Sequence, residues 1–192
     1  MSPGGRLSAL VLAASLFAPA ESLDWAVQRR MQAERSPALD RVMEALTDGA
    51  KPPVVFGGLL LIAAFGGPAG PAIARHALYA LLPANLVVEV TKRAVDRQRP
   101  EGTHKRSNAS FPSSHAANAA ALAWVLGWHW RRAAPFLGAL ALAVAGSRIY
   151  LNRHFLSDVL VGVIIGVACG WLVTRTVGRG AAWASRDKRR VA

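Results

Sequence analysis

Cysteine is almost absent from this chain, whose one cysteine, Cys169, lies inside an apolar run. One thiol excludes a disulfide framework within the chain, and with it the class of small secreted domains that such frameworks hold together. Internal repeats and low-complexity tracts are also missing. We therefore treat the 192 residues as one domain.

Acidic residues are scarce, since 11 Asp and Glu face 23 Lys and Arg and the formal net charge is +12. The basic residues lie between apolar runs and form no continuous stripe, so we expect no nucleic-acid partner. The chain is 53% hydrophobic, and its mean hydropathy is +0.27. Apolar segments separated by basic residues are typical of a multi-pass membrane protein.

The apolar runs predict an all-α fold, a bundle of six transmembrane helices. Prolines, glycines and polar residues separate the runs, and the predicted spans cover residues 7–20, 52–66, 72–91, 114–130, 133–151 and 157–177. The first run also resembles a secretory signal peptide, although we favour a retained helix.

The segment after the first span differs from its neighbours in composition. Residues 21–50 carry six acidic and four basic residues, with apolar residues at helical spacing. This pattern predicts an amphipathic helix at the membrane surface, and a solvated connector is the alternative.

Six spans place both termini on one side of the membrane. Arg131, Arg132 and the basic tail from Arg175 would lie on that side, which the positive-inside rule makes cytoplasmic. Residues 92–113 and 148–154 then lie on the other side although they are also basic, and we explain their charge by the binding of an anion. We expect a protein of the cell (inner) membrane with its active site on the non-cytoplasmic face.

Three clusters at span ends carry the candidate chemistry, and the first is the basic stretch 92–100. Lys92 and Arg99 lie seven residues apart, two helical turns, so both would face one point if the helix continued to Arg99. Pro100 should end the helix there. Basic residues at a helix end also meet lipid headgroups, so this cluster alone is a weak signal.

The second cluster is Pro112-Ser113-Ser114-His115, which precedes an alanine-rich helix. Ser113 or Ser114 is a suitable N-cap, and the free N–H groups of a helix N-terminus can bind a phosphate. His115 could protonate a leaving oxygen. Alone, the pattern also fits a capped helix with an incidental interfacial histidine.

The third cluster spans residues 147–158. Arg148 can bind a phosphate through two parallel hydrogen bonds. His154 and Asp158 lie four residues apart, so on a helix Asp158 would hold one tautomer of His154 and leave the other ring nitrogen free to attack. The pair alone could be structural, but the three clusters together indicate phosphoryl transfer.

The combined pattern Lys-x6-Arg-Pro, Pro-Ser-x-His and Ser-Arg-x5-His-x3-Asp resembles the type 2 phosphatidic acid phosphatase family, in its membrane-bound lipid phosphate phosphatase branch. The resemblance implies that the phosphoryl oxygens bind to Lys92, Arg99, Arg148, Ser113 and the backbone of Ser114. It also implies that His154 is the nucleophile, that Asp158 orients it, and that His115 is the general acid. The family usually has glycine where this chain has Ser114, and glycine permits closer approach; serine still supplies the N–H group.

These residues lead us to expect hydrolysis of a lipid-linked phosphate or diphosphate through a phosphohistidine, without a metal or other cofactor. Near the site only Asp96, Glu101 and Asp158 are acidic, which is few for a two-metal centre. Undecaprenyl diphosphate is our first substrate, and phosphatidic acid or phosphatidylglycerol phosphate is the alternative. A vanadate-dependent haloperoxidase and a non-catalytic lipid-binding or transport protein are the rivals from other classes. Membrane lipids are the expected partners, and no oligomeric state is predicted.

Overall fold

A computed structural model describes residues 21–103 and 108–191, which contain helices and no strand. Residues 21–33 are helical. The elements that follow are α2 (Pro37–Gly49), α3 (Pro52–Phe65), a 3-10 turn (Gly67–Ala69), α4 (Gly70–Val95), α5 (Ser114–His129), a second 3-10 turn (Arg131–Ala133), α6 (Ala134–Tyr150) and α7 (Leu156–Val191). The all-α expectation is confirmed for these residues.

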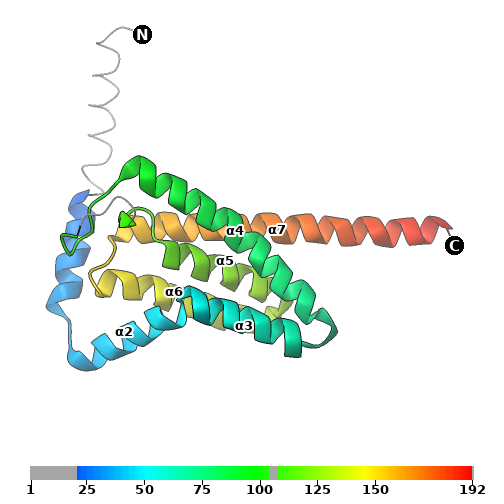
Figure 1. Cartoon of the computed structure of the whole chain (residues 1–192), viewed down its shortest axis with the longest axis horizontal. Coiled ribbons are helices and arrows are strands. Elements are labelled where there is room, and N and C mark those ends of the chain that lie inside the picture. Colours follow the sequence, from blue (N-terminus) through cyan, green and yellow to red (C-terminus); the bar gives the residue numbers. More distant parts are fainter. Residues whose placement is uncertain (1–20, 104–107, 192) are drawn as a thin grey trace, which may run out of the picture.

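Helix α5 is the centre of the bundle, because α4, α6 and α7 all pack against it (Figure 1). From α3 to α7, successive helices run in opposite directions (Figure 1). The last turns of α4 and α6 therefore lie at the same end of the bundle as the first turns of α5 and α7. This arrangement gathers Lys92, His115, Arg148 and Asp158 at one end, which we call the catalytic end.

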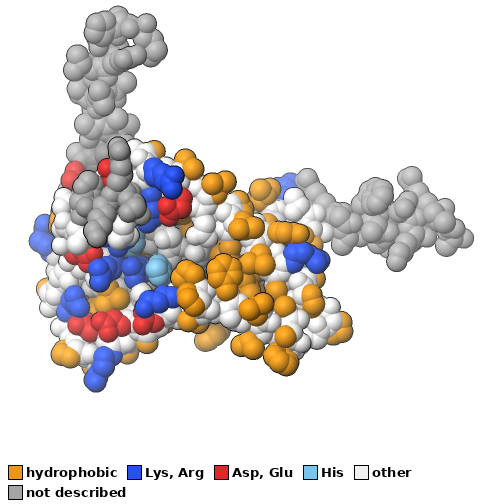
Figure 2. Space-filling view, viewed as in Figure 1, with side chains coloured by type: hydrophobic (Ala, Val, Ile, Leu, Met, Phe, Trp, Pro, Cys, Tyr) orange, Lys and Arg blue, Asp and Glu red, His pale blue; other side chains and the backbone are white. Residues whose placement is uncertain are grey.

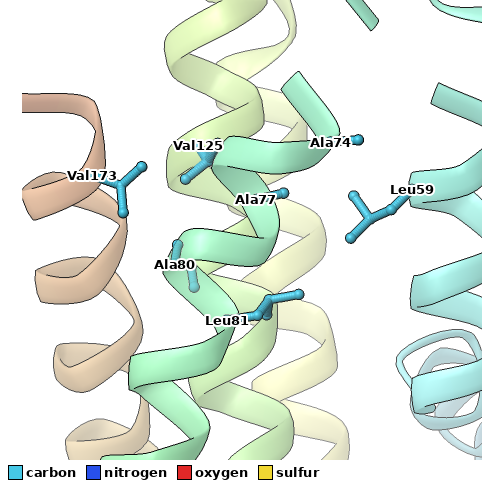
Figure 3. Close-up of a cluster of buried hydrophobic side chains, with 8 residues drawn as sticks. Leu59, Ala74, Ala77, Ala80, Leu81, Val125 and Val173 are labelled. Carbon is cyan, nitrogen blue, oxygen red and sulfur yellow. The ribbon is translucent and has the colours of Figure 1, made fainter. Parts of the chain in front are cut away.

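A cluster of small buried side chains holds the other half of the bundle together (Figure 3). It joins four helices through Leu59, Ala74, Ala77, Ala80, Leu81, Ala121, Val125 and Val173. Alanine occupies four of these positions and has no side-chain entropy to lose on burial. Its small volume allows the backbones of α4 and α5 to approach closely.

Three glycines allow α7 to lie directly on α5. A Cβ atom on Gly162 would lie 2.5 Å from the carbonyl oxygen of Ser113, and one on Gly170 would lie 2.9 Å from Cβ of Trp124. One on Gly166 would meet the carbonyl oxygen of Ala117 well inside van der Waals contact. The glycine stripe thus sets the position of Asp158, near the start of α7, against the start of α5.

Replacing Gly166 with alanine should destabilise the fold by about 1–3 kcal/mol, the usual effect of overpacking a tight contact. Thermal unfolding of the purified protein in detergent measures this loss. Gly57→Ala is the matched control, because a Cβ there meets nothing within 4 Å; it should be neutral or slightly stabilising. Equal effects of the two substitutions would contradict the assigned packing.

The described residues contain three helices long and apolar enough to cross a membrane, Gly67–Val95, Arg131–Tyr150 and Leu156–Val177. Helices α2 and α3, bent by 57° relative to one another, would make a fourth span if they cross as a pair. The predicted span 7–20 lies outside the described residues. The predicted span 114–130 forms α5, which has 16 residues. The six-span count is therefore not confirmed, but the chain is a multi-pass membrane protein, and large apolar side chains cover much of its outer surface (Figure 2).

Three local expectations differ from the structure. Segment 21–50 is two helices rather than one, because Ser36 accepts a hydrogen bond from the N–H of Leu39 and Pro37 begins α2. Helix α4 ends at Val95, where Asp96 adopts a left-handed conformation (φ 47°), so Arg99 lies in a loop. Helix α7 begins at Leu156, so His154 precedes the helix instead of sharing it with Asp158.

Candidate active site

A polar cavity of about 610 Å³ opens at the catalytic end, with His115 and Arg148 among its lining residues. Most of the charged and histidine side chains on the visible face gather at this end of the molecule, while apolar side chains predominate over the rest of that face (Figure 2). Several of the charged groups are buried, and Lys92, Arg99 and Arg148 are between 5% and 8% exposed. Burying several cations together is costly unless an anion compensates them.

His154 is fixed by a backbone carbonyl. Its Nδ1 lies 2.7 Å from the carbonyl oxygen of Ser110, and because a carbonyl only accepts, Nδ1 carries the proton and Nε2 keeps the lone pair. Burial lowers the pKa of His154 to about 4, although neighbouring Asp158 acts to raise it. The imidazole is therefore neutral at physiological pH, which is the form that can attack phosphorus.

The sequence prediction for Asp158 needs a correction, since its carboxylate lies 3.7 Å from Nδ1 of His154 and is too far to hold the tautomer directly. The carboxylate instead accepts hydrogen bonds from the hydroxyl of Ser110 and from the N–H of Phe155, at 2.8 Å. The second bond closes the first turn of α7, as in a capping box. Asp158 thus acts on His154 through Ser110, whose carbonyl oxygen binds the ring.

Arg97 and Asp24 complete this network, and sequence reasoning missed both. Arg97 donates to Asp158 and to Asp24, each at 2.8 Å, and its guanidinium lies 4.1 Å from the ring centroid of Phe155. Asp24 also accepts from the N–H of Ser157 at 2.8 Å. The first helical segment, predicted to lie at the membrane surface, therefore contributes a buried carboxylate to the support of the catalytic end.

Arg97→Gln should destabilise the protein by about 3 kcal/mol, because it removes the ion-pair partner that the buried carboxylates of Asp24 and Asp158 share. We place the effect at the low end of the usual range because Arg97 itself is 24% exposed. Unfolding in detergent measures the loss, and Arg93→Gln, at an exposed position nearby, is the control. Adding Asp24→Asn should restore part of the stability, and purely additive losses would contradict this coupling.

The start of α5 has the geometry of an anion site. The side chain of Ser113 is the N-cap and accepts from the N–H of Ala116 at 3.4 Å, as predicted, while its own N–H donates to the carbonyl oxygen of Asp158 at 3.0 Å. Ser114 is the first residue of α5, so its N–H is one of the groups that a helix leaves unpaired. The part assigned to Ser114 remains a prediction.

Three buried side-chain atoms lack a hydrogen-bond partner among the described residues: Oε1 of Gln28, Nε2 of His115 and Nε of Arg148. Buried polar groups without partners are rare in folded proteins. Of the three residues, His115 and Arg148 line the polar cavity, so a ligand that offers oxygen atoms there would satisfy both of their nitrogens. A phosphoryl group has this chemistry.

The remaining cations are near but partly engaged. Nζ of Lys92 donates to the carbonyl oxygen of Ala109 at 3.2 Å. Arg99 donates to the backbone and side-chain oxygens of Asn108, at 3.0 and 2.6 Å, and to the carbonyl oxygen of Arg153 at 3.2 Å. A guanidinium has five N–H donors, so Arg99 retains two for a ligand.

The predicted residues come together, because His115 lies within electrostatic range of Arg148, His154, Lys92 and Arg99. In the part of the chain that the structure describes, no three His, Cys, Asp or Glu side chains are grouped closely enough to hold a metal ion. The site therefore offers cationic groups and a helix N-terminus for anion binding.

Comparisons with known proteins agree with this site. The sequence profile of the PAP2 superfamily matches residues 73–181, more than half of the chain, and this range contains all three clusters. Phosphatidylglycerophosphatase B of Bacillus subtilis (strain 168) is 30% identical over 195 residues, covering 85% of this chain and 88% of that protein. Decaprenylphosphoryl-5-phosphoribose phosphatase of Mycobacterium tuberculosis (strain H37Rv) is 37% identical over 132 residues, covering 64% and 73%.

Two crystal structures share the fold. A transmembrane PAP2-type phosphatidylglycerolphosphate phosphatase from Bacillus subtilis aligns with a TM-score of 0.73 at 27% identity, over 90% of this chain and 94% of that one. LpxE from Aquifex aeolicus aligns with a TM-score of 0.70 at 25% identity, over 79% and 94%. The chain belongs to the PAP2 superfamily, and it is a membrane-embedded phosphatase of that family.

Proposed function

We propose that this protein removes a terminal phosphate from a membrane lipid in two steps, through a phosphohistidine at His154. The observation that carries the proposal is a pair of buried nitrogens, Nε2 of His115 and Nε of Arg148, which have no partner among the described residues and lie in one cavity among buried cations. Such a constellation suits the charge that spreads over phosphoryl oxygens as the ester bond breaks.

The first step forms a bond between Nε2 of His154 and phosphorus while the bond from phosphorus to the lipid oxygen breaks. His115 donates a proton to that leaving oxygen. In the second step water attacks phosphorus, His115 takes up a proton from the water, and the bond between phosphorus and Nε2 breaks. Inorganic phosphate leaves, and both histidines return to their starting states.

A second cavity supports a lipid substrate. It measures about 550 Å³, is almost wholly apolar, and lies between α2, α5 and α6. Its α5 wall lies on the helix face of His115, at spacings of three and four residues, and consists of Asn118, Leu122 and Leu126. Its α6 wall lies on the helix face of Arg148 and includes Val144, Leu140 and Leu137. A phosphate held by His115 and Arg148 would thus have a hydrocarbon channel along the same two helices.

The two candidate substrate classes are lipid diphosphates and lipid phosphomonoesters. The sequence favoured undecaprenyl diphosphate, and the names of the relatives favour a lipid phosphomonoester, since the relative aligned over 85% of this chain is a phosphatidylglycerophosphatase. We therefore place phosphatidylglycerol phosphate first, with undecaprenyl diphosphate second and phosphatidic acid third.

We also propose that the catalytic end faces away from the cytoplasm in the cell (inner) membrane. Gln98 is exposed at this end, so Gln98→Cys in a Cys169→Ala background gives a single thiol to probe. A membrane-impermeant maleimide should label it in intact cells. Labelling that requires cell lysis would reverse the proposed orientation.

Phosphate release by the purified protein across these three lipids, with and without chelator, tests the proposed function. We expect turnover of at least one lipid phosphate, unchanged by chelator, because cationic side chains occupy the place that a metal takes in other phosphatases. Activity that is lost in chelator and restored by magnesium would contradict the mechanism, and halide oxidation with added vanadate would favour the haloperoxidase alternative.

A further inference from the structure

A groove on the outer face of the bundle lies apart from the polar cavity and from the apolar channel beside it. Helices α6 and α7 each pack closely on α5 but scarcely contact one another, so a groove of about 770 Å³ runs between them with α5 as its floor. Small residues make up much of its floor and of the α6 wall, namely Ala120, Ala123, Gly127, Gly138 and Ala141. The groove is open because these positions carry glycine or alanine, whose side chains do not fill the space between α6 and α7.

Tryptophans form a rigid part of this groove. The indole Nε1 of Trp124 donates to the hydroxyl of Thr174 at 3.1 Å, and Gly170 lies directly against Trp124. Trp171 lies across the groove and is stacked with Arg175, whose guanidinium is 4.7 Å from the ring centroid. The groove thus has fixed walls before any ligand binds, which lowers the entropy cost of binding.

Two arginines mark the end of the groove that is far from the catalytic residues. Arg131 follows the last turn of α5, and Arg175 lies 17 residues beyond Asp158 on α7, about 25 Å along the helix. Among the described residues neither arginine has an ion-pair partner. The groove thus joins an apolar trough in the membrane-crossing part of the bundle to two guanidinium groups at its end, one of which is stacked on Trp171.

We propose that this groove binds one anionic phospholipid, with an acyl chain along α5 and the phosphate between Arg131 and Arg175. The apolar trough matches a hydrocarbon chain, and guanidinium groups match phosphate oxygens in charge and geometry. The bound lipid is not the substrate, because its phosphate lies about 25 Å from Asp158 and His154. It joins α5, α6 and α7, the three helices that carry His115, Arg148 and Asp158, and it stabilises their arrangement.

The test is quenching of tryptophan fluorescence in the full chain by lipids with brominated acyl chains, in detergent micelles. Phosphatidylserine is the anionic probe, and phosphatidylcholine with the same chains is the zwitterionic reference. We expect the wild-type protein to reach half-maximal quenching at about a tenfold lower mole fraction of phosphatidylserine, because charge-assisted hydrogen bonds to phosphate are strong.

Two kinds of variant separate this site from general attraction to a basic protein. Arg131→Gln with Arg175→Gln removes the cationic end, and Gly138→Leu fills the trough at a position where a Cβ meets no atom within 4 Å. Both should abolish the preference for phosphatidylserine, while hydrolysis of a short-chain soluble phosphate stays at the wild-type rate. Arg132→Gln, a neighbouring arginine that does not line the groove, should retain the preference.

Three results would overturn the proposal: no preference in the wild type, a preference that survives in both groove variants, or a loss of preference in Arg132→Gln as large as in the arginine pair. The first would show that the groove binds acyl chains without selecting an anionic headgroup. The other two would assign the effect to surface charge. None depends on the proposed phosphatase mechanism, since binding is read directly and does not require turnover.

Discussion

Replacing His154 with alanine should lower kcat/KM for a lipid phosphate on the order of 10⁴-fold or more, because a covalent mechanism loses its nucleophile. The ring is 1% exposed and its Nδ1 proton is bound to the carbonyl oxygen of Ser110, so the imidazole is held in one position. Phosphate release under steady-state conditions measures the loss, with the circular dichroism spectrum and thermal unfolding as checks of folding.

His129→Ala is the matched control for this experiment. His129 contacts His76 at 3.0 Å, at the opposite end of the bundle, and takes no part in the proposed chemistry. It should retain activity within about twofold, since substitutions away from the reacting groups and the tightly packed core usually have small effects. Wild-type rates in His154→Ala would show that the nucleophile is misassigned, and lipid binding without turnover in the wild type would favour a non-catalytic protein.

Replacing His115 with asparagine should reduce kcat by about 10²–10⁴-fold for a lipid phosphate, the usual contribution of a general acid. A lipid alkoxide is a poor leaving group and needs the proton that His115 supplies. His115 has a buried Nε2 without a partner among the described residues, and it lines the cavity with Arg148. Asparagine keeps a polar side chain of similar length, so binding should suffer less than turnover.

The leaving group distinguishes acid catalysis from simple positioning. With a nitrophenyl phosphate, whose leaving oxygen needs no proton, the first step should be nearly normal in His115→Asn. The phosphoenzyme should then accumulate, because the second step still lacks its base. An equal loss for the lipid and the nitrophenyl substrate, without any burst of nitrophenol, would assign His115 to phosphate binding instead.

Much of the site could be predicted from the sequence because its residues lie in short, chemically distinctive stretches. Ser113 is a favourable N-cap before an alanine-rich run, and the structure begins α5 directly after it. The glycines at positions 162, 166 and 170 recur every four residues, a pattern typical of close helix packing, and the structure places all three against α5 or its N-cap. In each case the signal is local in sequence, and the structure uses it locally.

The missed interactions are long-range or depend on backbone conformation. Asp24 contacts Ser157, 133 residues away, and no local pattern encodes that contact. Asp24 and Gln28 lie four residues apart on one helix face, and both are buried; polar residues on the inner face of an amphipathic segment were the available signal. The left-handed conformation of Asp96 ended α4 earlier than Pro100 would have required, so Arg99 reached the site from a loop.

The support for His154 was also misassigned for a physical reason. The i, i+4 rule applied to His154 and Asp158 assumes that both are helical, but α7 begins between them, at Leu156. The freed backbone of residues 151–155 turns the imidazole towards the carbonyl of Ser110. Asp158 then stabilises that arrangement through Ser110 and the N–H of Phe155.

Acid-quench and alkaline-quench trapping of the enzyme during turnover of a ³²P-labelled lipid phosphate tests the covalent intermediate most directly. We predict protein-bound label that survives alkali and is lost in acid, as a phosphoramidate requires, located by mass spectrometry on the peptide that contains His154 and absent from His154→Ala. Label on a serine or an aspartate, or steady turnover in which rapid quenching detects no labelled protein, would contradict it.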